Sequence, residues 1–174
     1  MTRTISVRST EAPDHEAILA CVKAAFSTGG RDGVEEVAIV GETWSRAAGI
    51  RGLDIVAMSG DQVAGHVLGG LGRLGDREAV GLAPLAVRPD FQRQGVGSRL
   101  VREFLERANR DHWPLVLLLG NPAYYSRFGF EPAGPLGIVY APFGPGDPHF
   151  QVARLDAYDE SWRGEFTYCW ELDR

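Results

Sequence analysis

Residues 85–105 read LAVRPDFQRQGVGSRLVREFL, and this stretch constrains the fold more than any other part of the chain. It opens with three apolar residues that suit a buried strand, and Pro89 ends this strand because proline has no N–H to donate to a sheet. After Gly95 and Gly97, apolar side chains recur with the 3.6-residue period of a helix. The stretch therefore predicts a strand, a tight turn and a helix that starts at the two glycines.

A helix that begins directly after a glycine turn can hold an anion. Its first backbone N–H groups have no partner within the helix and lie at the positive end of the helix dipole. Gly95 and Gly97 have no Cβ atoms, so a phosphate can approach the backbone closely. We therefore expect a phosphate-binding loop here. The alternative is an ordinary strand-to-helix turn that happens to contain glycine.

Three segments, in the same order along the chain, resemble the GNAT superfamily of acyl-CoA-dependent N-acetyltransferases. They are the strand with its L-A-V-x-P-x-F pattern, the motif Gln92-x-x-Gly95-x-Gly97, and residues 121–130, which read NPAYYSRFGF. The second is similar to the family's pyrophosphate motif Q/R-x-x-G-x-G/A, and the third to its Y-x-x-x-G-F segment. The resemblance is specific over about residues 78–131. The PAYYxRFGF motif and the tail after it are similar to an uncharacterised bacterial branch of the family.

The resemblance implies an α/β fold of the GNAT type, with a mixed, mainly antiparallel sheet flanked by helices. In that fold the strand before the pyrophosphate loop separates from the next parallel strand, and the pantetheine arm of acyl-CoA lies between them. The separated segments would be residues 85–87 and 115–119. Pro84 fits such an opening because it cannot complete a regular ladder. We expect a single domain over residues 1–174, with residues 131–174 as its strand and loop extension.

The apolar periodicity also predicts the other elements of the chain. In chain order we expect a strand over residues 4–8, helices over 14–26 and 34–48, strands over 53–58, 63–71, 78–87 and 114–119, a short helix over 123–128, and strands over 149–155 and 165–172. Residues 70–75 match the G-x-G-x-x-G dinucleotide motif, but no helix follows them. We therefore interpret them as a hairpin loop without nucleotide binding.

The resemblance implies an acyl-donor site built largely from backbone groups. An N–H freed on the opened strand would polarise the acyl carbonyl, as an oxyanion hole does. Asn121 would contact the cofactor arm, although it precedes Tyr125 by fewer residues than is common in the family. The expected donor-binding residues are Leu85, Ala86, Val87, Gln92, Arg93, Gln94, Gly95, Val96, Gly97, Ser98 and Asn121.

Tyr125 is the expected catalytic residue. It lies four residues before Gly129, where the family pattern places the tyrosine that protonates the departing CoA sulfur. A phenol has an ordinary pKa of about 10, so it keeps its proton at neutral pH. The alternative is that Tyr125 is a packing aromatic, as we expect for Tyr124.

The general base that many family members use is missing at the matching position of this sequence. Many members use a glutamate on the central strand, but the matching position is Gly81, and Glu78 would face the other side of a regular strand. A base matters because an alkylammonium has a pKa near 10.4, which leaves about one amine in a few thousand unprotonated at neutral pH. The open candidates are a chain of waters, Glu35, Glu36 and His66, of which His66 on a strand is more often structural.

Composition excludes other classes of protein. The net charge of -5 offers no electrostatic footprint for nucleic acid or an anionic membrane. The N-terminus has no signal-peptide core, no apolar run has the length of a membrane span, and the cysteines have no metal-ligand spacing. We expect a cytoplasmic protein without a metal, and the sequence leaves a homodimer open. Motifs of zinc hydrolases, thiol redox enzymes and α/β-hydrolases are missing.

The function implied by the resemblance is N-acetyl transfer. Acetyl-CoA would be the donor and a primary amine of a small molecule or peptide would be the acceptor, attacking directly in a ternary complex. The main alternative is a catalytically weak domain of the same fold that binds acyl-CoA as a sensor or interaction module, which the missing glutamate favours. A longer acyl group or an oxygen acceptor is a further alternative.

Overall fold

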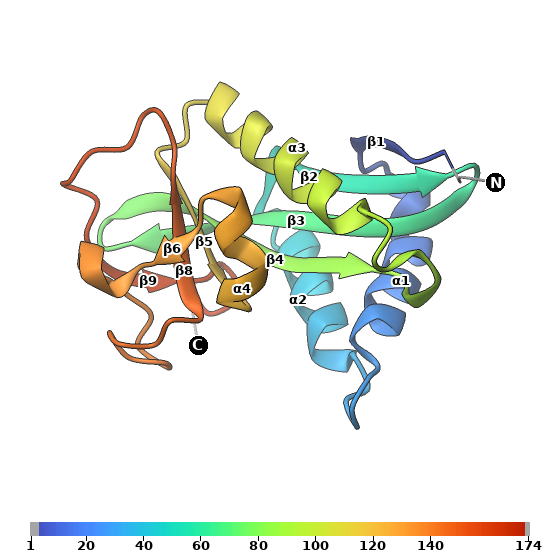
Figure 1. Ribbon diagram of the computed structural model, residues 1–174, viewed down its shortest axis with the longest axis horizontal. Coiled ribbons are helices and arrows are strands. Elements are labelled where there is room, and N and C mark those ends of the chain that lie inside the picture. The colour runs from blue at the N-terminus through green and yellow to red at the C-terminus, as the bar shows by residue number, and fades with distance from the viewer. Residues whose placement is uncertain (1–3, 173–174) are drawn as a thin grey trace. The chain divides into compact units, whose positions relative to one another are not determined.

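The computed structural model describes residues 4–172, which form two compact units (Figure 1). The first unit takes in residues 4–68 and 83–104, and the second takes in residues 69–82 and 105–172. Three elements continue from one unit into the other, namely β3 (Gln62–Leu74), β4 (Arg77–Val87) and α3 (Val96–Arg110).

The first unit begins with β1 (Ser6–Ser9), a short 3-10 turn η1 (Ala12–Asp14), and two helices, α1 (His15–Phe26) and α2 (Val34–Ser45). The strand β2 (Gly49–Ser59) follows and pairs antiparallel with β1, so that Ser6 lies opposite Met58. The end of β4 leads through the 3-10 turn η2 (Pro89–Phe91) into α3. This connection is the strand, turn and helix that residues 85–105 predict.

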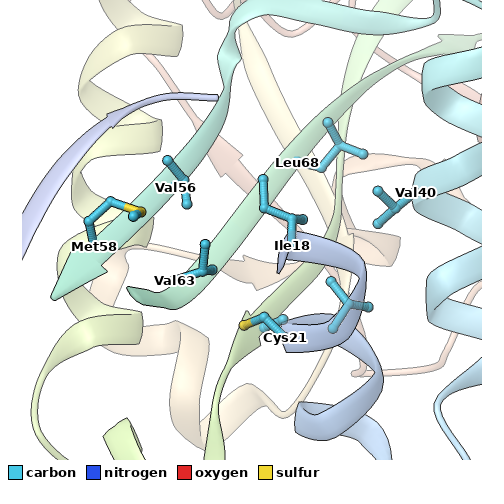
Figure 2. Close-up of a cluster of buried hydrophobic side chains, with 9 residues drawn as sticks. Ile18, Cys21, Val40, Val56, Met58, Val63 and Leu68 are labelled. Carbon is cyan, nitrogen blue, oxygen red and sulfur yellow. The ribbon is translucent and has the colours of Figure 1, made fainter. Parts of the chain in front are cut away.

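The two faces of the first unit's strands are covered by different helices (Figure 1). Side chains of α1 and α2 pack on one face against β2 and β3 (Figure 2), in a cluster that includes Ile18, Cys21, Val22, Val40, Val56, Met58, Val63, Leu68 and Ala86. On the other face, a Cβ at Gly65 would lie 3.0 Å from Leu100 and 3.2 Å from Val96 of α3. Each large apolar side chain buried here contributes roughly 1.5–3 kcal/mol, and Ala86 ties the end of β4 into this cluster.

The second unit contains a parallel pair of strands. β5 (Leu115–Leu119) runs parallel to β4, with Val80 opposite Val116 and Gly81 opposite Leu117. Its other edge pairs antiparallel with β8 (Phe150–Arg154). The remaining elements are α4 (Pro122–Tyr125), η3 (Ser126–Phe128), β6 (Glu131–Pro132), η4 (Gly134–Leu136), β7 (Ile138–Val139) and β9 (Gly164–Thr167).

The hydrogen-bonded strand order is β1-β2-β3-β4-β5-β8-β6, with β9 beside β3 and β7 beside β9. The expected α/β fold, with a mixed sheet and one parallel pair, is confirmed. β4 continues through Pro84 as one strand. Its residues that pair with β5 are Val80 and Gly81. The opening expected at residues 85–87 stays a prediction.

The expected hairpin loop over residues 70–75 is wrong, because residues up to Leu74 belong to β3. The physical reason lies at Gly72, where a Cβ would come within 2.6 Å of ring carbons of Phe166 on β9. Glycine therefore lets an aromatic ring pack flat on a buried strand. Of residues 70–75, only Gly75, with φ of 62°, takes the left-handed conformation of a turn.

Other boundaries differ by a few residues. α2 ends at Ser45 and Gly49 already begins β2, so the helix is shorter than its apolar pattern suggests. α4 begins earlier than expected because Pro122 occupies the first helical position, which proline favours. The two closing strands are confirmed but shorter than predicted, and the short β7, which pairs parallel with β9, was not predicted.

Candidate active site

The loop before α3 has the backbone geometry of an anion site. Gly95 has φ of 83°, and Arg93 has φ of 58°, a left-handed conformation that is uncommon outside glycine. The first helical hydrogen bond runs from the Arg99 N–H to the Gly95 carbonyl, at 3.0 Å. The N–H groups of the three residues between them, Val96, Gly97 and Ser98, therefore precede the helical ladder and can bind an anion.

Glutamine side chains brace this loop from within. The Gln92 amide donates to the Val87 carbonyl at 3.0 Å, and the Gln94 amide donates to the Asp90 carbonyl at 2.9 Å. Both side-chain amides therefore bond to backbone carbonyls next to the loop. These bonds fix the turn that presents the backbone N–H groups. The Arg99 guanidinium donates to the Ile5 carbonyl, so it too is held by the protein.

The expected strand residues Leu85, Ala86 and Val87 form the end of β4 and lead directly into this loop. Ala86 is fully buried in the cluster under α1 and α2, so its methyl group serves the core. Leu85 and Val87 are half-buried. The donor-binding role that we expect for this segment therefore falls to its backbone.

Asn121 caps α4. Its side-chain oxygen accepts a hydrogen bond from the Ala123 N–H at 3.0 Å, and its carbonyl accepts from the N–H of Tyr124 and of Tyr125. Such a cap stabilises a short helix by about 1 kcal/mol. The expected contact between Asn121 and the cofactor stays a prediction, and the oxygen of its amide is already used.

Tyr125 lies on α4, half-buried among other aromatic rings. Its ring meets Tyr124 edge-on at 4.9 Å and Phe130 edge-on at 5.6 Å. A Cβ at Gly120 would overlap the ring, so glycine at this position makes room for it. Burial, followed by the charge of Tyr124, raises the pKa of Tyr125 well above its ordinary value of 10. The hydroxyl is therefore a proton donor at neutral pH.

Gly81, which we expect at the position of the family's glutamate, is covered by an aromatic ring. A Cβ on Gly81 would lie 2.8 Å from two ring carbons of Tyr168, closer than real Cβ atoms approach other atoms. Only 2% of Tyr168 is exposed. A carboxylate could not occupy this position without displacing the ring. The sequence carries no signal for this role of Tyr168, because only the tertiary fold brings it to the strand.

The hydroxyl of Tyr168 is buried, and within residues 4–172 no group forms a hydrogen bond with it. The backbone N–H of Leu119, at the end of β5, lies close by without reaching normal hydrogen-bond geometry. Burial, followed by the nearby Tyr140 and Glu171, raises the pKa of Tyr168 well above 10. Its oxygen is therefore protonated and able to donate.

His66 is a paired, buried histidine. Its Nε2 lies 2.7 Å from a carboxylate oxygen of Asp54, whose other oxygen accepts from the Trp44 indole at 2.8 Å. His66 is fully buried, and its Nδ1 has no partner among the described residues. Burial alone would raise the pKa of Asp54, but hydrogen bonds from His66, Thr10 and Trp44 outweigh it and lower this pKa. The arrangement supports the structural role for His66.

The two glutamate candidates for the base differ in environment. Glu35 is exposed at the start of α2. Glu36 is 8% exposed and forms an ion pair with Arg31, and its second carboxylate oxygen is buried without a partner among residues 4–172. Both glutamates belong to the first unit and Gly81 to the second, and the base stays unassigned.

Comparison with known proteins agrees with this geometry. Residues 54–132 match a model of the acetyltransferase (GNAT) domain. A crystal structure of the GNAT family N-acetyltransferase YhbS from Escherichia coli, solved in complex with CoA, superposes with a TM-score of 0.85 at 30% identity. The alignment covers 98% of this chain and 92% of that one. The chain belongs to the GNAT family of N-acetyltransferases.

Other GNAT proteins are similar over different shares of their length. A Brucella melitensis GNAT acetyltransferase, crystallised with acetyl-CoA, has a TM-score of 0.77 and 26% identity over 95% of this chain and 96% of its own. The curated protein YhbS from E. coli strain K12, described as an uncharacterised N-acetyltransferase, is 48% identical over 56 residues. That match spans 32% of this chain and 34% of the curated protein, about a third of its length.

The described part of this GNAT chain has neither a membrane-spanning helix nor a metal-binding cluster. No helix within residues 4–172 has the length and apolar character to cross a membrane. The same residues contain no cluster of three or more histidine, cysteine, aspartate or glutamate side chains that could hold a metal ion.

Proposed function

We propose that the protein transfers an acetyl group from acetyl-CoA to a primary amine of a small molecule or peptide. The observation that carries this proposal is the start of α3, where three N–H groups precede the helical ladder behind a loop braced by Gln92 and Gln94. Such a site matches the charge and size of a pyrophosphate. Two similar GNAT proteins were crystallised with CoA or acetyl-CoA, which supports the same donor here.

In this proposal the amine attacks the thioester carbon while both substrates are bound. A C–N bond forms, and collapse of the tetrahedral intermediate breaks the C–S bond. The sulfur takes a proton from Tyr125, the proton of the acylated amine passes to water, and Tyr125 regains a proton from water. Burial keeps Tyr125 protonated, as an acid requires. Its high pKa also makes it a weak acid, so we expect a rate contribution at the low end of the range for general acids.

The alternative is a domain that binds acyl-CoA without efficient transfer. The observation that favours it is the Tyr168 ring at Gly81, which replaces the carboxylate that many family members use as a base. Acyl transfer would then depend on amines that are already unprotonated. The acceptor, a homodimer and the cytoplasmic location stay predictions.

One experiment separates the two functions. The protein is incubated with acetyl-CoA and a panel of primary amines while the release of free thiol is followed at pH 7 and pH 9. We expect one class of amine to release thiol well above the rate of donor hydrolysis. Tight binding of acetyl-CoA by calorimetry without thiol release from any amine would support the binding module instead.

A further inference from the structure

Gln151 is a polar side chain buried in the sheet of the second unit. It lies on β8, with Leu118 of β5 opposite it on one side and Pro132 of β6 on the other. Only 1% of Gln151 is exposed, and burying an amide is costly unless hydrogen bonds compensate the loss of water. Apolar packing therefore does not explain a glutamine at this position, and its hydrogen bonds indicate what it does.

The Gln151 amide joins two backbone carbonyls at the end of β5. Its Nε2 donates to the Gly120 carbonyl at 2.9 Å and to the His149 carbonyl at 3.3 Å. The Gly120 N–H donates to the same His149 carbonyl at 2.9 Å, so the three residues form a closed ring of hydrogen bonds. This ring holds both the N–H and the carbonyl of Gly120, at the point where the chain leaves β5 for α4.

Gly120 is the residue on which the Tyr125 ring packs. A Cβ at Gly120 would overlap Cε2 and Cδ2 of that ring. Because Cε2 is bonded to the ring carbon that carries the hydroxyl, the Gly120 backbone lies beside the reactive end of this side chain. A Cβ at Gly120 would also meet the Leu118 side chain, so the two share a face of β5. Gln151 stands directly opposite Leu118, and its side chain therefore lies on the same face.

We propose that Gln151 is a positioning residue that sets where the Tyr125 hydroxyl lies. Its amide fixes the Gly120 backbone, on which the ring packs, and the next residue, Asn121, accepts from the Tyr125 N–H at 3.1 Å. A shift at Gly120 therefore moves the seat of the ring and the start of α4 together. The inference rests on the proposed role of Tyr125 as the acid that gives its proton to the sulfur. A misplaced acid transfers this proton more slowly, because the transfer needs hydrogen-bond reach.

A double-mutant cycle in kcat tests the inference, with acetyl-CoA and the best amine from the panel. Gln151→Met keeps an unbranched side chain and removes the donor. We expect its kcat to fall about tenfold, a smaller loss than the factor of about 10² expected for Tyr125→Phe. In a Tyr125→Phe background the same change should have no further effect, because no hydroxyl is left to position.

Gln151→Glu adds a readout in pH. Burial raises the pKa of a carboxyl group, and only the protonated form has an O–H that can donate to the Gly120 carbonyl. The ratio of the variant's kcat to the wild-type kcat should therefore rise as the pH is lowered from 9 to 6. The same ratio for Gln151→Met should stay level, because methionine does not titrate.

Val152→Ala is the matched control for lost stability. Val152 is fully buried at the next position of β8, and the alternation of a strand places its side chain on the other face of the sheet. It should lower the melting temperature and leave kcat unchanged, whereas a similar loss of kcat would show that lost stability alone explains the effect.

An unchanged kcat in Gln151→Met would overturn the inference, and so would an equal loss in the Tyr125→Phe background. A level ratio for Gln151→Glu, or a failure of both Gln151 variants to fold, would also overturn it in favour of a purely structural glutamine. Wild-type turnover by Tyr125→Phe would refute the acid itself, and no transfer by the wild type would refute the proposed function.

Discussion

The ring of Tyr168 lies so close to Gly81 that a single added methyl group at Gly81 would come within 2.8 Å of two of its carbons. Both residues are buried, so neither can move into solvent to relieve the contact. The contact leaves room only for a glycine at this position, which we expect to match the glutamate of many family members. It also makes the strand intolerant of substitution at this point.

Gly81→Ala should therefore destabilise the protein by about 1–3 kcal/mol, the usual cost of overpacking a core. Gly81→Glu, which restores the family's carboxylate, should cost more because it also buries a charge. Chemical denaturation measures both changes. Gly146→Ala is the control, since a Cβ there meets nothing within 4 Å, and its effect should stay within about 0.5 kcal/mol. Equal stability of Gly81→Ala and Gly146→Ala would show that the ring moves freely.

Gly97→Asp should weaken acetyl-CoA binding. It places a carboxylate among the first N–H groups of α3, where the pyrophosphate is expected. We expect the Kd measured by calorimetry to rise at least about tenfold, which corresponds to about 1.4 kcal/mol. Gly41→Asp, on α2 where a Cβ would meet nothing within 4 Å, adds the same charge away from the loop and should leave the Kd unchanged. If a folded Gly97→Asp variant binds with wild-type affinity, the donor site lies elsewhere.

Tyr125→Phe should reduce kcat and leave donor binding nearly intact. The ring keeps its contacts with Tyr124 and Phe130, so the Kd for acetyl-CoA should change less than about threefold. A general acid is typically worth 10²–10⁴ in rate, and we expect about 10² here because burial makes this phenol a weak acid. Tyr124→Phe is the control and should turn over at the wild-type rate. Should Tyr125→Phe do the same, the sulfur takes its proton from water.

Asp54→Asn should lower stability in a way that depends on pH. The folded-state pKa of Asp54 is depressed below the unfolded value of about 3.9 by its hydrogen bonds from His66, Thr10 and Trp44, despite its burial. Its contribution is therefore present in full above about pH 5 and disappears as the pH falls through the folded-state pKa. Urea denaturation should show a wild-type advantage of about 1–3 kcal/mol at pH 7 and a smaller one at pH 3.5. An advantage of the same size at both values would contradict a stabilising, ionised Asp54 carboxylate.

Local patterns in the sequence were enough to predict the core of the fold. The apolar period after Gly97, the strand that Pro89 ends and the continuous apolar run of β5 depend on short-range physics, and the structure confirms them. The same stretch predicted the loop whose backbone N–H groups precede the ladder of α3, since a glycine turn before a helix exposes such groups in any context.

Contacts between distant segments were decided only by the tertiary structure. The glycines of β3 suggest a loop when viewed alone, but Phe166 packs on Gly72 and makes that segment a strand. Similarly, Gly81 marks only a missing glutamate in the sequence, while the fold brings the Tyr168 ring onto it. Periodicity predicts which face of an element is buried, because it reflects local geometry. It carries no information on which distant side chain fills that face, because this partner depends on how the chain packs as a whole.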